Sequence, residues 1–307
     1  MKIGVALPQV GRLGGPANIA TACRSAESLG YDSVWVNDRV LWPTEPQAPF
    51  PATADGSLHP EWKHNLDALD TLTFAAAHSS TLRLGTSVLI LPVYDPVLLA
   101  RRLTTIDILS GGRLIAGLGL GWSPDEYGAT GTGWSDRAKR MEDSLEVISK
   151  IWAGGAVAHD SPYTHFSESI FEATPVRRPP VYLSAYSPAG LARIAAMADG
   201  WMPAGVPIPA MREMFGGIRA MAEGAGRDPG EIGLIVRGNC TIVGELPDAD
   251  RFPFVGSIDQ IIEDVHACQE IGANEVFLDV QFSSDVEGFE DYLDRMHAFA
   301  ALNAVLA

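Results

Sequence analysis

The chain has 307 residues, of which 47% are hydrophobic and 20% are charged, a composition typical of a globular protein with a sizeable core. Its formal net charge is −16, which excludes the basic footprint that nucleic-acid binding requires. No segment approaches the roughly eighteen consecutive apolar residues of a membrane helix, and residues 1–11 are typical of a strand and not of a secretory signal. We therefore expect a cytoplasmic protein that binds neither nucleic acid nor membrane.

The cysteines of the chain are odd in number and widely spaced: Cys23, Cys240 and Cys268. The sequence contains neither a Cys-x-x-Cys pair nor a cluster of Cys and His. This pattern predicts no structural disulfide and no metal site, and it is typical of a reducing compartment. We expect all three side chains to be buried among apolar neighbours.

Short β-branched runs alternate along the chain with longer runs that have helical spacing. The short runs predict strands over 3–7, 33–37, 83–91, 113–118, 181–184, 200–203, 232–243 and 275–280. The longer runs predict helices over 17–29, 66–79, 95–109, 135–153, 188–198, 207–225, 258–271 and 287–303. Most of the strands are continuous apolar runs, as expected for a parallel sheet that is covered by helices.

This strict alternation predicts an α/β fold, a (β/α)8 TIM barrel, in which residues 1–307 form a single domain. Segments 38–65, 119–134 and 154–180 are longer than a barrel connection needs. The first two follow the carboxyl ends of strands, so we expect insertions at the C-terminal mouth, where barrel enzymes carry their active sites. The third precedes the fifth strand, and we expect it to cover a helix or the bottom of the barrel.

A G-x-G-x-G motif, made of Gly117, Gly119 and Gly121, follows the fourth predicted strand. In a dinucleotide-binding fingerprint the glycines open a helix at once, whereas here helical spacing resumes only near Ser135. We therefore favour a barrel strand whose glycines allow a ligand or a neighbouring backbone to come close. The alternative is that these glycines only relieve crowding inside the barrel.

Four segments, 31–43, 84–122, 181–201 and 256–280, carry a family pattern, and the run from Leu84 to Trp122 is its most specific part. The chain resembles the luciferase-like oxidoreductases, the superfamily of bacterial luciferase-type enzymes that use FMN or the deazaflavin coenzyme F420. The resemblance implies a TIM barrel with the flavin-like ring at its C-terminal mouth. It also implies a non-proline cis peptide bond between Ser87 and Val88, which supports one face of the ring.

The resemblance further implies that the cofactor lies along the later strands. Segment 184–190 links the fifth strand to its helix, and free N–H groups at a helix start hold a phosphate without many cations. The ordinary alternative for this segment is a plain helix cap. The cofactor-binding residues that we predict are Ser87, Val88, Gly119, Gly121, Tyr186, Ser187, Ala189 and Gly205.

The chain departs from the pattern of the sugar-phosphate dehydrogenases of this superfamily. Those enzymes carry Asp-His after the second strand and Glu after the glycines of the fourth, whereas this chain has Asp38-Arg39 and Gly121-Trp122. Hydride abstraction from a sugar alcohol needs such an acid and base, so we do not expect that activity. Asp38 remains a polar candidate at a strand end, unless it only forms an ion pair with Arg39 or Arg83.

A redox cofactor carries the electrons, so the protein must supply a proton donor and a substrate pocket. The predicted catalytic residues are Asp38, His64 and Tyr127, and Glu126 is a further proton donor on the mouth loops. Trp42 and Trp122 are predicted to line the substrate pocket, although tryptophans also serve as ordinary barrel packing.

The function that we expect is hydride transfer between F420 and a small organic substrate. The first alternative is an FMN-dependent monooxygenase that uses O2 and a partner flavin reductase, and the second is a non-catalytic barrel that has lost cofactor binding. By analogy we expect a homodimer that forms through helices 66–79 and 95–109.

Overall fold

The architecture is a closed parallel barrel in the computed structural model, which describes residues 1–51, 53, 55–247 and 251–305, with 303–305 as backbone only. The strands pair in the order β3-β2-β1-β13-β10-β9-β8-β5-β4, and β3 also pairs with β5, which closes the sheet. Since β3 and β4 are two parts of one barrel strand, the nine labelled strands form an eight-stranded barrel. Its strands are β1 (Lys2–Ala6), β2 (Ser33–Val36), β3 (Arg83–Thr86), β4 (Leu89–Ile90), β5 (Leu114–Gly119), β8 (Val181–Ser184), β9 (Gly200–Trp201), β10 (Gly233–Asn239) and β13 (Glu275–Asp279). The TIM-barrel prediction is confirmed.

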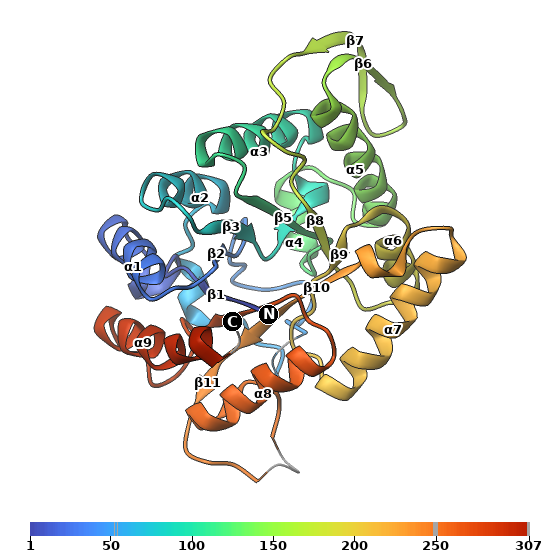
Figure 1. Cartoon of the computed structure of the whole chain (residues 1–307). Helices are drawn as coiled ribbons and strands as arrows, with labels where there is room; N and C mark the ends of the chain where they lie inside the picture. Colours follow the sequence, from blue (N-terminus) through green and yellow to red (C-terminus); the bar gives the residue numbers. More distant parts are fainter. Residues whose placement is uncertain (52, 54, 248–250, 306–307) are drawn as a thin grey trace.

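A ring of helices surrounds the strands, as Figure 1 shows. Its members are α1 (Pro16–Ser28), α2 (Ala68–Ala77), α3 (Pro96–Ser110), α5 (Arg137–Ala153), α6 (Pro188–Met197), α7 (Ile208–Gly224), α8 (Ile258–Glu270) and α9 (Phe289–Val305). Local chemistry fixes several ends: Asp95 caps α3 by accepting from two backbone N–H groups, and Ser257 forms a capping box with Gln260 at α8. The predicted helices therefore end within about two residues of the observed ones. Among the described helices, none is both long enough and apolar enough to span a membrane.

The predicted strands over 83–91 and 232–243 were wrong as continuous elements. The first is divided at Ser87–Val88, where the peptide bond is cis, as the resemblance implied. The second ends at Asn239, and the chain then forms a separate small pair of β11 (Thr241–Ile242) and β12 (Val255–Gly256). Both breaks occur at the mouth, where the chain leaves the barrel.

The insertions and some shorter connections contain elements that the sequence pattern did not predict. These are α4 (Pro124–Ala129), the hairpin strands β6 (Gly155–Asp160) and β7 (His165–Phe171), and the 3-10 turns η1 (Gly11–Leu13), η2 (Pro60–Lys63), η3 (Leu91–Val93) and η4 (Pro229–Glu231). The four 3-10 turns and the six-residue α4 are too short to produce a clear period of 3.6 residues.

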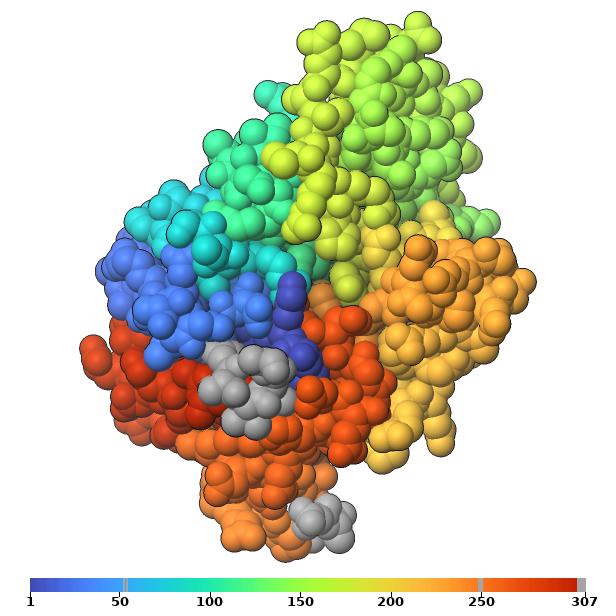
Figure 2. All heavy atoms as spheres, in the orientation of Figure 1, coloured from blue at the N-terminus to red at the C-terminus, as the bar shows by residue number. Residues whose placement is uncertain are grey.

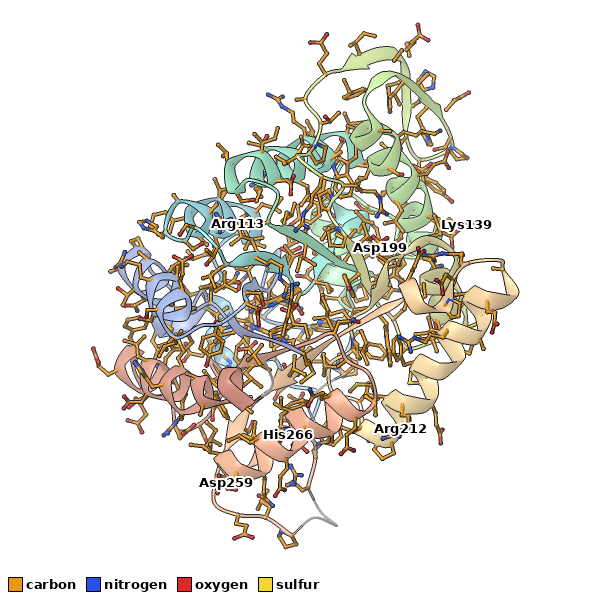
Figure 3. The ribbon with its side chains drawn as sticks, in the orientation of Figure 1. Arg113, Lys139, Asp199, Arg212, Asp259 and His266 are labelled. Atoms are coloured by element: carbon orange, nitrogen blue, oxygen red, sulfur yellow. The ribbon has the colours of Figure 1, made fainter. Side chains whose placement is uncertain are left out.

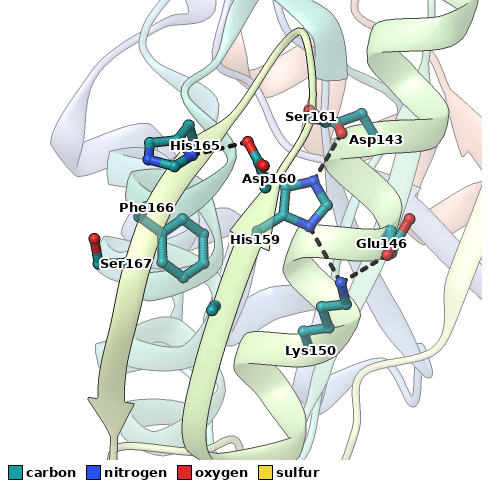
Figure 4. A pocket seen from close by; sticks show the side chains of 10 residues that line it. Asp143, Glu146, Lys150, His159, Asp160, Ser161, His165, Phe166 and Ser167 are labelled. Carbon is teal, nitrogen blue, oxygen red and sulfur yellow. Dashed lines mark hydrogen bonds and ion pairs between the residues drawn. The ribbon is translucent and has the colours of Figure 1, made fainter.

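The β6–β7 hairpin stands away from the barrel next to α5, and Figure 2 shows it as a protruding lobe. His159 fastens it, because its ring lies between Asp143, with Nε2 2.8 Å from the carboxylate, and Lys150, with Nδ1 3.2 Å from Nζ (Figure 4). A surface cavity of about 430 Å3 lies between the hairpin and α5. As expected, the third insertion covers a helix, because Tyr163 and Thr164 contact Arg140 and Asp143 of α5.

Aromatic and aliphatic side chains fill the barrel axis. The rings of Trp35 and Phe277 stack with their centroids 4.5 Å apart, and both residues are almost completely buried. Gly85 makes room for them, because a Cβ at this position would overlap the Trp35 ring. The same buried cluster also contains Ala6, Ile115, Met202 and Ile235.

Polar contacts close the amino ends of the strands. Next to the indole of Trp35, Glu275 accepts a hydrogen bond from Trp35 Nε1 at 3.1 Å and forms an ion pair with Arg83. Further out, Arg113 donates to Ser79 Oγ and to the backbone oxygen of Leu82, and Figure 3 labels this arginine beside α2. These contacts brace the barrel at the end opposite the mouth.

The three cysteines, Cys23, Cys240 and Cys268, are buried and unpaired, as predicted. Burial raises the pKa of Cys23 and of Cys268 to about 12, so both thiols remain protonated at neutral pH.

Candidate functional site

The first two insertions lie across one side of the barrel mouth and are fastened to each other. Gln47, from segment 38–65, donates from its backbone and its side chain to Asp125 at 3.0 and 2.8 Å. The backbone N–H of Val40 donates to Glu126 Oε1 at 2.8 Å. Phe50 packs against Trp122, with ring centroids 5.3 Å apart. Helix α4 therefore holds the long loop that follows β2 over the barrel.

A buried cation lies beneath this cover. The guanidinium of Arg39 lies 5.1 Å from the ring centroid of Trp62 and 4.9 Å from that of Trp122, a distance at which cation–π attraction is effective. Its Nε is 3.4 Å from Glu126 Oε1, and the two side chains are only 6% and 1% exposed. Burial raises the pKa of Glu126, although the neighbouring Arg39 opposes the shift. Burial lowers the pKa of Arg39, because it disfavours the charged form of the guanidinium just as it disfavours the charged form of Glu126.

Several polar atoms of this cluster are buried without a hydrogen-bond partner among the described residues. They are Nη2 and Nε of Arg39, Oε2 of Glu126, and the indole Nε1 atoms of Trp62 and Trp122. A buried polar group without a partner costs roughly 1–3 kcal/mol, so native proteins pair such groups with water or a ligand. The cluster is thus suited to binding a small polar group.

Asp38 lies beside this cluster, at the end of β2. Its Oδ2 accepts hydrogen bonds from the backbone N–H of Ile90 at 3.0 Å and from the hydroxyl of Tyr94 at 2.9 Å. Burial raises its pKa to about 6, and the nearby Glu126 carboxylate contributes to that shift. The ion pairs of Arg39 and Arg83 are formed with Glu126 and Glu275, so the expectation that either arginine pairs with Asp38 was wrong.

The junction between β3 and β4 forms a second part of the mouth. The backbone oxygen of Ser87 accepts a hydrogen bond from Arg237 Nη1 at 3.0 Å, and Arg237 Nη2 lies 2.6 Å from Asp279 Oδ2. Gly119 lies against Val88, because a Cβ at residue 119 would come within 2.6 Å of Val88 Cγ2. The structure therefore brings together Ser87, Val88 and Gly119, as predicted for one site.

The loops after β8 and β9 form a further part of the rim, next to the insertion that follows β5. The hydroxyl of Tyr186 contacts Ser184 Oγ at 3.2 Å and accepts from the backbone N–H of Ala204 at 3.1 Å. Ser187 caps α6 by accepting from the N–H of Gly190, and Ser187 and Ala189 are exposed at this helix start. Gly205 has a φ of +63° and open space where a side chain would stand. The rim presents backbone groups and few bulky side chains.

The remaining predicted residues lie in different surroundings. Tyr127 is buried, and its hydroxyl donates to the backbone oxygen of Leu120. His64 is exposed, and its backbone oxygen accepts from Gly11. Trp42 packs under the ammonium group of Lys63, 4.5 Å from its ring centroid. Gly121 has a φ of +63° and lies against Ile90.

Arg237 and Asp279 are mouth residues that the sequence analysis missed. Both lie near the carboxyl ends of observed strands, β10 and β13, and a charged residue within an apolar strand was the signal that could have identified them. Among the described residues, no group of three or more His, Cys, Asp or Glu side chains is arranged to hold a metal ion.

Comparison of the sequence with known proteins identifies the family to which the chain belongs. The profile of the luciferase-like monooxygenases matches residues 1–251. An uncharacterised protein of Mycobacterium tuberculosis is 32% identical over 186 residues, which are 60% of this chain and 66% of that protein. The F420-dependent hydroxymycolic acid dehydrogenase of the same organism is 26% identical over 246 residues, 77% of this chain and 63% of the dehydrogenase. The chain thus spans slightly less than two thirds of the length of these relatives.

Solved structures share the fold along the whole chain. The monooxygenase RslO1 from Streptomyces bottropensis superposes with a TM-score of 0.80 and 20% identity, covering 100% of both chains. An F420-dependent secondary alcohol dehydrogenase in complex with an F420-acetone adduct superposes with a TM-score of 0.77 and 16% identity, covering 98% of this chain and 97% of that one. At these identities the likeness establishes the fold alone.

Proposed function

The chain belongs to the luciferase-like monooxygenase family, and from this premise we propose that it is an F420-dependent oxidoreductase that transfers a hydride between the deazaflavin and a small organic substrate. The F420-dependent dehydrogenases among its relatives support oxidoreductase activity. The observation that carries the proposal is the mouth itself, which has a rim of backbone groups and small residues on one side and an indole-lined polar cluster on the other.

The residues at the mouth fit a flavin-like group. Because Gly119 has no side chain, Val88 packs directly against the backbone there, where a Cβ would come within 2.6 Å of Val88 Cγ2, whereas Gly205 faces open space. Ser187 and Ala189 lie at the start of α6, where the helix dipole favours an anion, so they would hold the phosphate. When bound, the reduced deazaflavin would supply a hydride, which is a proton together with two electrons. Arg237 holds the Ser87 carbonyl, and the paired insertions exclude water from the mouth.

Fluorescence titration of the purified protein with F420 and with FMN tests the proposal. We expect quenching that saturates at micromolar F420 and weaker quenching by FMN. Tight binding of FMN alone, followed by O2 uptake when reduced FMN is supplied by a flavin reductase, would establish the monooxygenase alternative. Binding of neither cofactor would favour a barrel that has lost its cofactor.

A pair of glycine variants makes the titration specific to the mouth. Gly119→Ala places a methyl group against Val88, and we expect it to weaken F420 binding about 10-fold or more. Gly128→Ala is the matched control, because residue 128 is exposed on α4 and has open space around it. Equal affinities for the two variants would argue against the predicted ring position.

We also propose that the protein is a homodimer that forms through α2 and α3. Leu98 and Leu109, on α3, expose 60% and 62% of their surface, and Phe74 on α2 is 37% exposed. A groove of about 370 Å3 runs between the two helices, and Thr73, Leu98, Arg101 and Ile106 are among the residues that line it. Exposed apolar side chains beside such a groove are typical of a surface that a second protein covers.

A further inference from the structure

We infer that Glu126 and Arg39 form the pair that binds and protonates the reacting oxygen of the substrate, and that the substrate is therefore an alcohol or the corresponding carbonyl compound. The inference rests on the proposed function, since an alcohol and its ketone differ by the hydride that the cofactor carries. It assigns the proton transfer to the buried carboxylate of α4, ahead of the other acids and hydroxyls of the mouth.

The first argument is the state of the two side chains. Glu126 uses Oε1 to accept from the Val40 backbone and to face Arg39 Nε, and the Leu41 backbone N–H also faces this carboxylate. Its Oε2 is buried and forms no hydrogen bond with the described residues. Arg39 likewise has Nη2 without a partner in that part of the chain. With side chains 1% and 6% exposed, neither group obtains its missing hydrogen bond from bulk water.

The second argument is the complementarity of the two free groups. A hydroxyl group both donates and accepts, so an alcohol can donate to Glu126 Oε2 while it accepts from Arg39 Nη2. A carbonyl oxygen accepts from Arg39 and from a protonated Glu126. One acceptor and one donor on two side chains that contact each other therefore match both members of an alcohol–carbonyl pair, and a hydrocarbon would leave both groups unpaired.

The third argument is the setting of the pair. The indoles of Trp62 and Trp122 flank the guanidinium, and Val40, two residues beyond Asp38, connects Glu126 to the end of β2. Asp38 in turn accepts from Ile90, two residues beyond Val88, where the ring is predicted to lie. The pair is thus linked through short contacts to the predicted cofactor position, in an apolar surrounding that strengthens hydrogen bonds to a developing charge.

The chemistry balances in both directions. In oxidation the O–H bond breaks and its proton passes to Glu126 Oε2, while the C–H bond breaks and its two electrons leave with the hydrogen as hydride to oxidised F420. The carbon–oxygen bond becomes double, and Arg39 retains its own protons while it stabilises the negative charge on the oxygen. In reduction by reduced F420 each of these changes runs in reverse.

Steady-state kinetics of the F420-loaded protein with 1-phenylethanol and acetophenone, and with cyclohexanol and cyclohexanone, test the inference. We expect turnover of at least one pair, and a decrease in kcat of about 10²- to 10⁴-fold for Glu126→Gln. Glu45→Gln, an exposed carboxylate of the same long loop, is the matched control and should retain the wild-type rate. Normal F420 binding without turnover of either pair would overturn this inference alone, whereas failure to bind F420 would overturn the proposed function.

The pH profile separates a catalytic role from a structural one. Oxidation needs Glu126 as the base, so kcat/KM for the alcohol should rise with pH through the pKa of this carboxyl and then level off. The charged groups that face it are Arg39, Asp125 and Asp38. Glu126→Gln should remove this rise and Asp38→Asn should retain it. A rise that persists in Glu126→Gln and disappears in Asp38→Asn would overturn the inference.

Two further measurements remain informative if Glu126→Gln is poorly folded. Glu126→Ala removes the carboxyl group, and added formate should restore part of the activity. The second measurement does not depend on turnover. Calorimetric titration of the F420-loaded protein with acetophenone should give a Kd about 10-fold or more higher for Arg39→Met than for wild type. Absence of rescue together with an unchanged Kd would overturn the assignment.

Discussion

Arg237 on β10 donates a hydrogen bond to the backbone oxygen of Ser87 across 3.0 Å, and so connects two strands that lie 150 residues apart in the sequence. Its second partner, the carboxylate of Asp279, is almost completely buried. The arginine thus spans the mouth at the position predicted to support the cofactor ring. Its loss would leave both a carboxylate and a carbonyl without their donor.

We expect Arg237→Gln to lower the free energy of unfolding by about 3–5 kcal/mol, because removal of one member of a buried pair leaves an uncompensated charge. Urea denaturation measures this difference. The double variant Arg237→Gln with Asp279→Asn should recover part of the loss, since the remaining amide is neutral. A single variant as stable as wild type would show that water replaces the guanidinium.

Asp38 should make stability depend on pH in the acidic range. Burial raises its pKa to about 6 from a usual value near 4, so between these pH values the folded chain holds a proton that the unfolded chain has released. Its contribution to stability is therefore present at low pH and is lost as pH rises through this window, by up to about 3 kcal/mol.

Asp38→Asn tests this dependence, because the amide does not titrate and can still accept from Ile90 and Tyr94. We expect the variant to gain stability relative to wild type as pH rises from 4 to 7, measured by denaturation at several pH values. A difference that does not change with pH would contradict the shifted pKa.

Packing along the barrel axis should tolerate no additional atom at Gly85. Gly85→Ala places a methyl group into the ring of Trp35, which is itself stacked on Phe277, and we expect a loss of about 1–3 kcal/mol or more. Gly216→Ala on α7 is the control, because open space surrounds that position and alanine favours a helix by about 1 kcal/mol. Thermal unfolding should therefore shift in opposite directions for the two variants.

The proposed homodimer predicts a change in mass when its apolar face becomes charged. Leu109→Glu should convert the protein to a monomer in sedimentation velocity, because it would bury a carboxylate against a partner. Ile170→Glu on the β6–β7 hairpin alters an equally exposed apolar residue and should leave the mass unchanged. A wild-type protein that sediments as a monomer would refute the proposal directly.

The barrel could be predicted from the sequence because its helices are long enough to show their period and because short apolar runs alternate with them. The cap residues Asp95 and Ser257 mark helix starts by local chemistry alone. The divided strand at Ser87 was invisible to periodicity, since the chain is almost continuously buried on both sides of the break; only the resemblance indicated it.

The site was less predictable because its contacts join distant segments. Arg39 next to Asp38 suggests a local ion pair, yet its partner Glu126 belongs to a six-residue helix that follows another strand. That α4 brings Glu126 beside Arg39 depends on how two long loops pack together. Neither loop carries a repeating pattern from which that packing could be inferred.

The stacked rings of Trp35 and Phe277 have a kinetic consequence. In the described residues the axis is filled, and Glu275 and Arg83 close the far end, so the mouth is the end of the barrel that remains for a ligand. In the proposed reaction, reactant and product would both pass through the mouth, so accumulated product would compete with the incoming reactant.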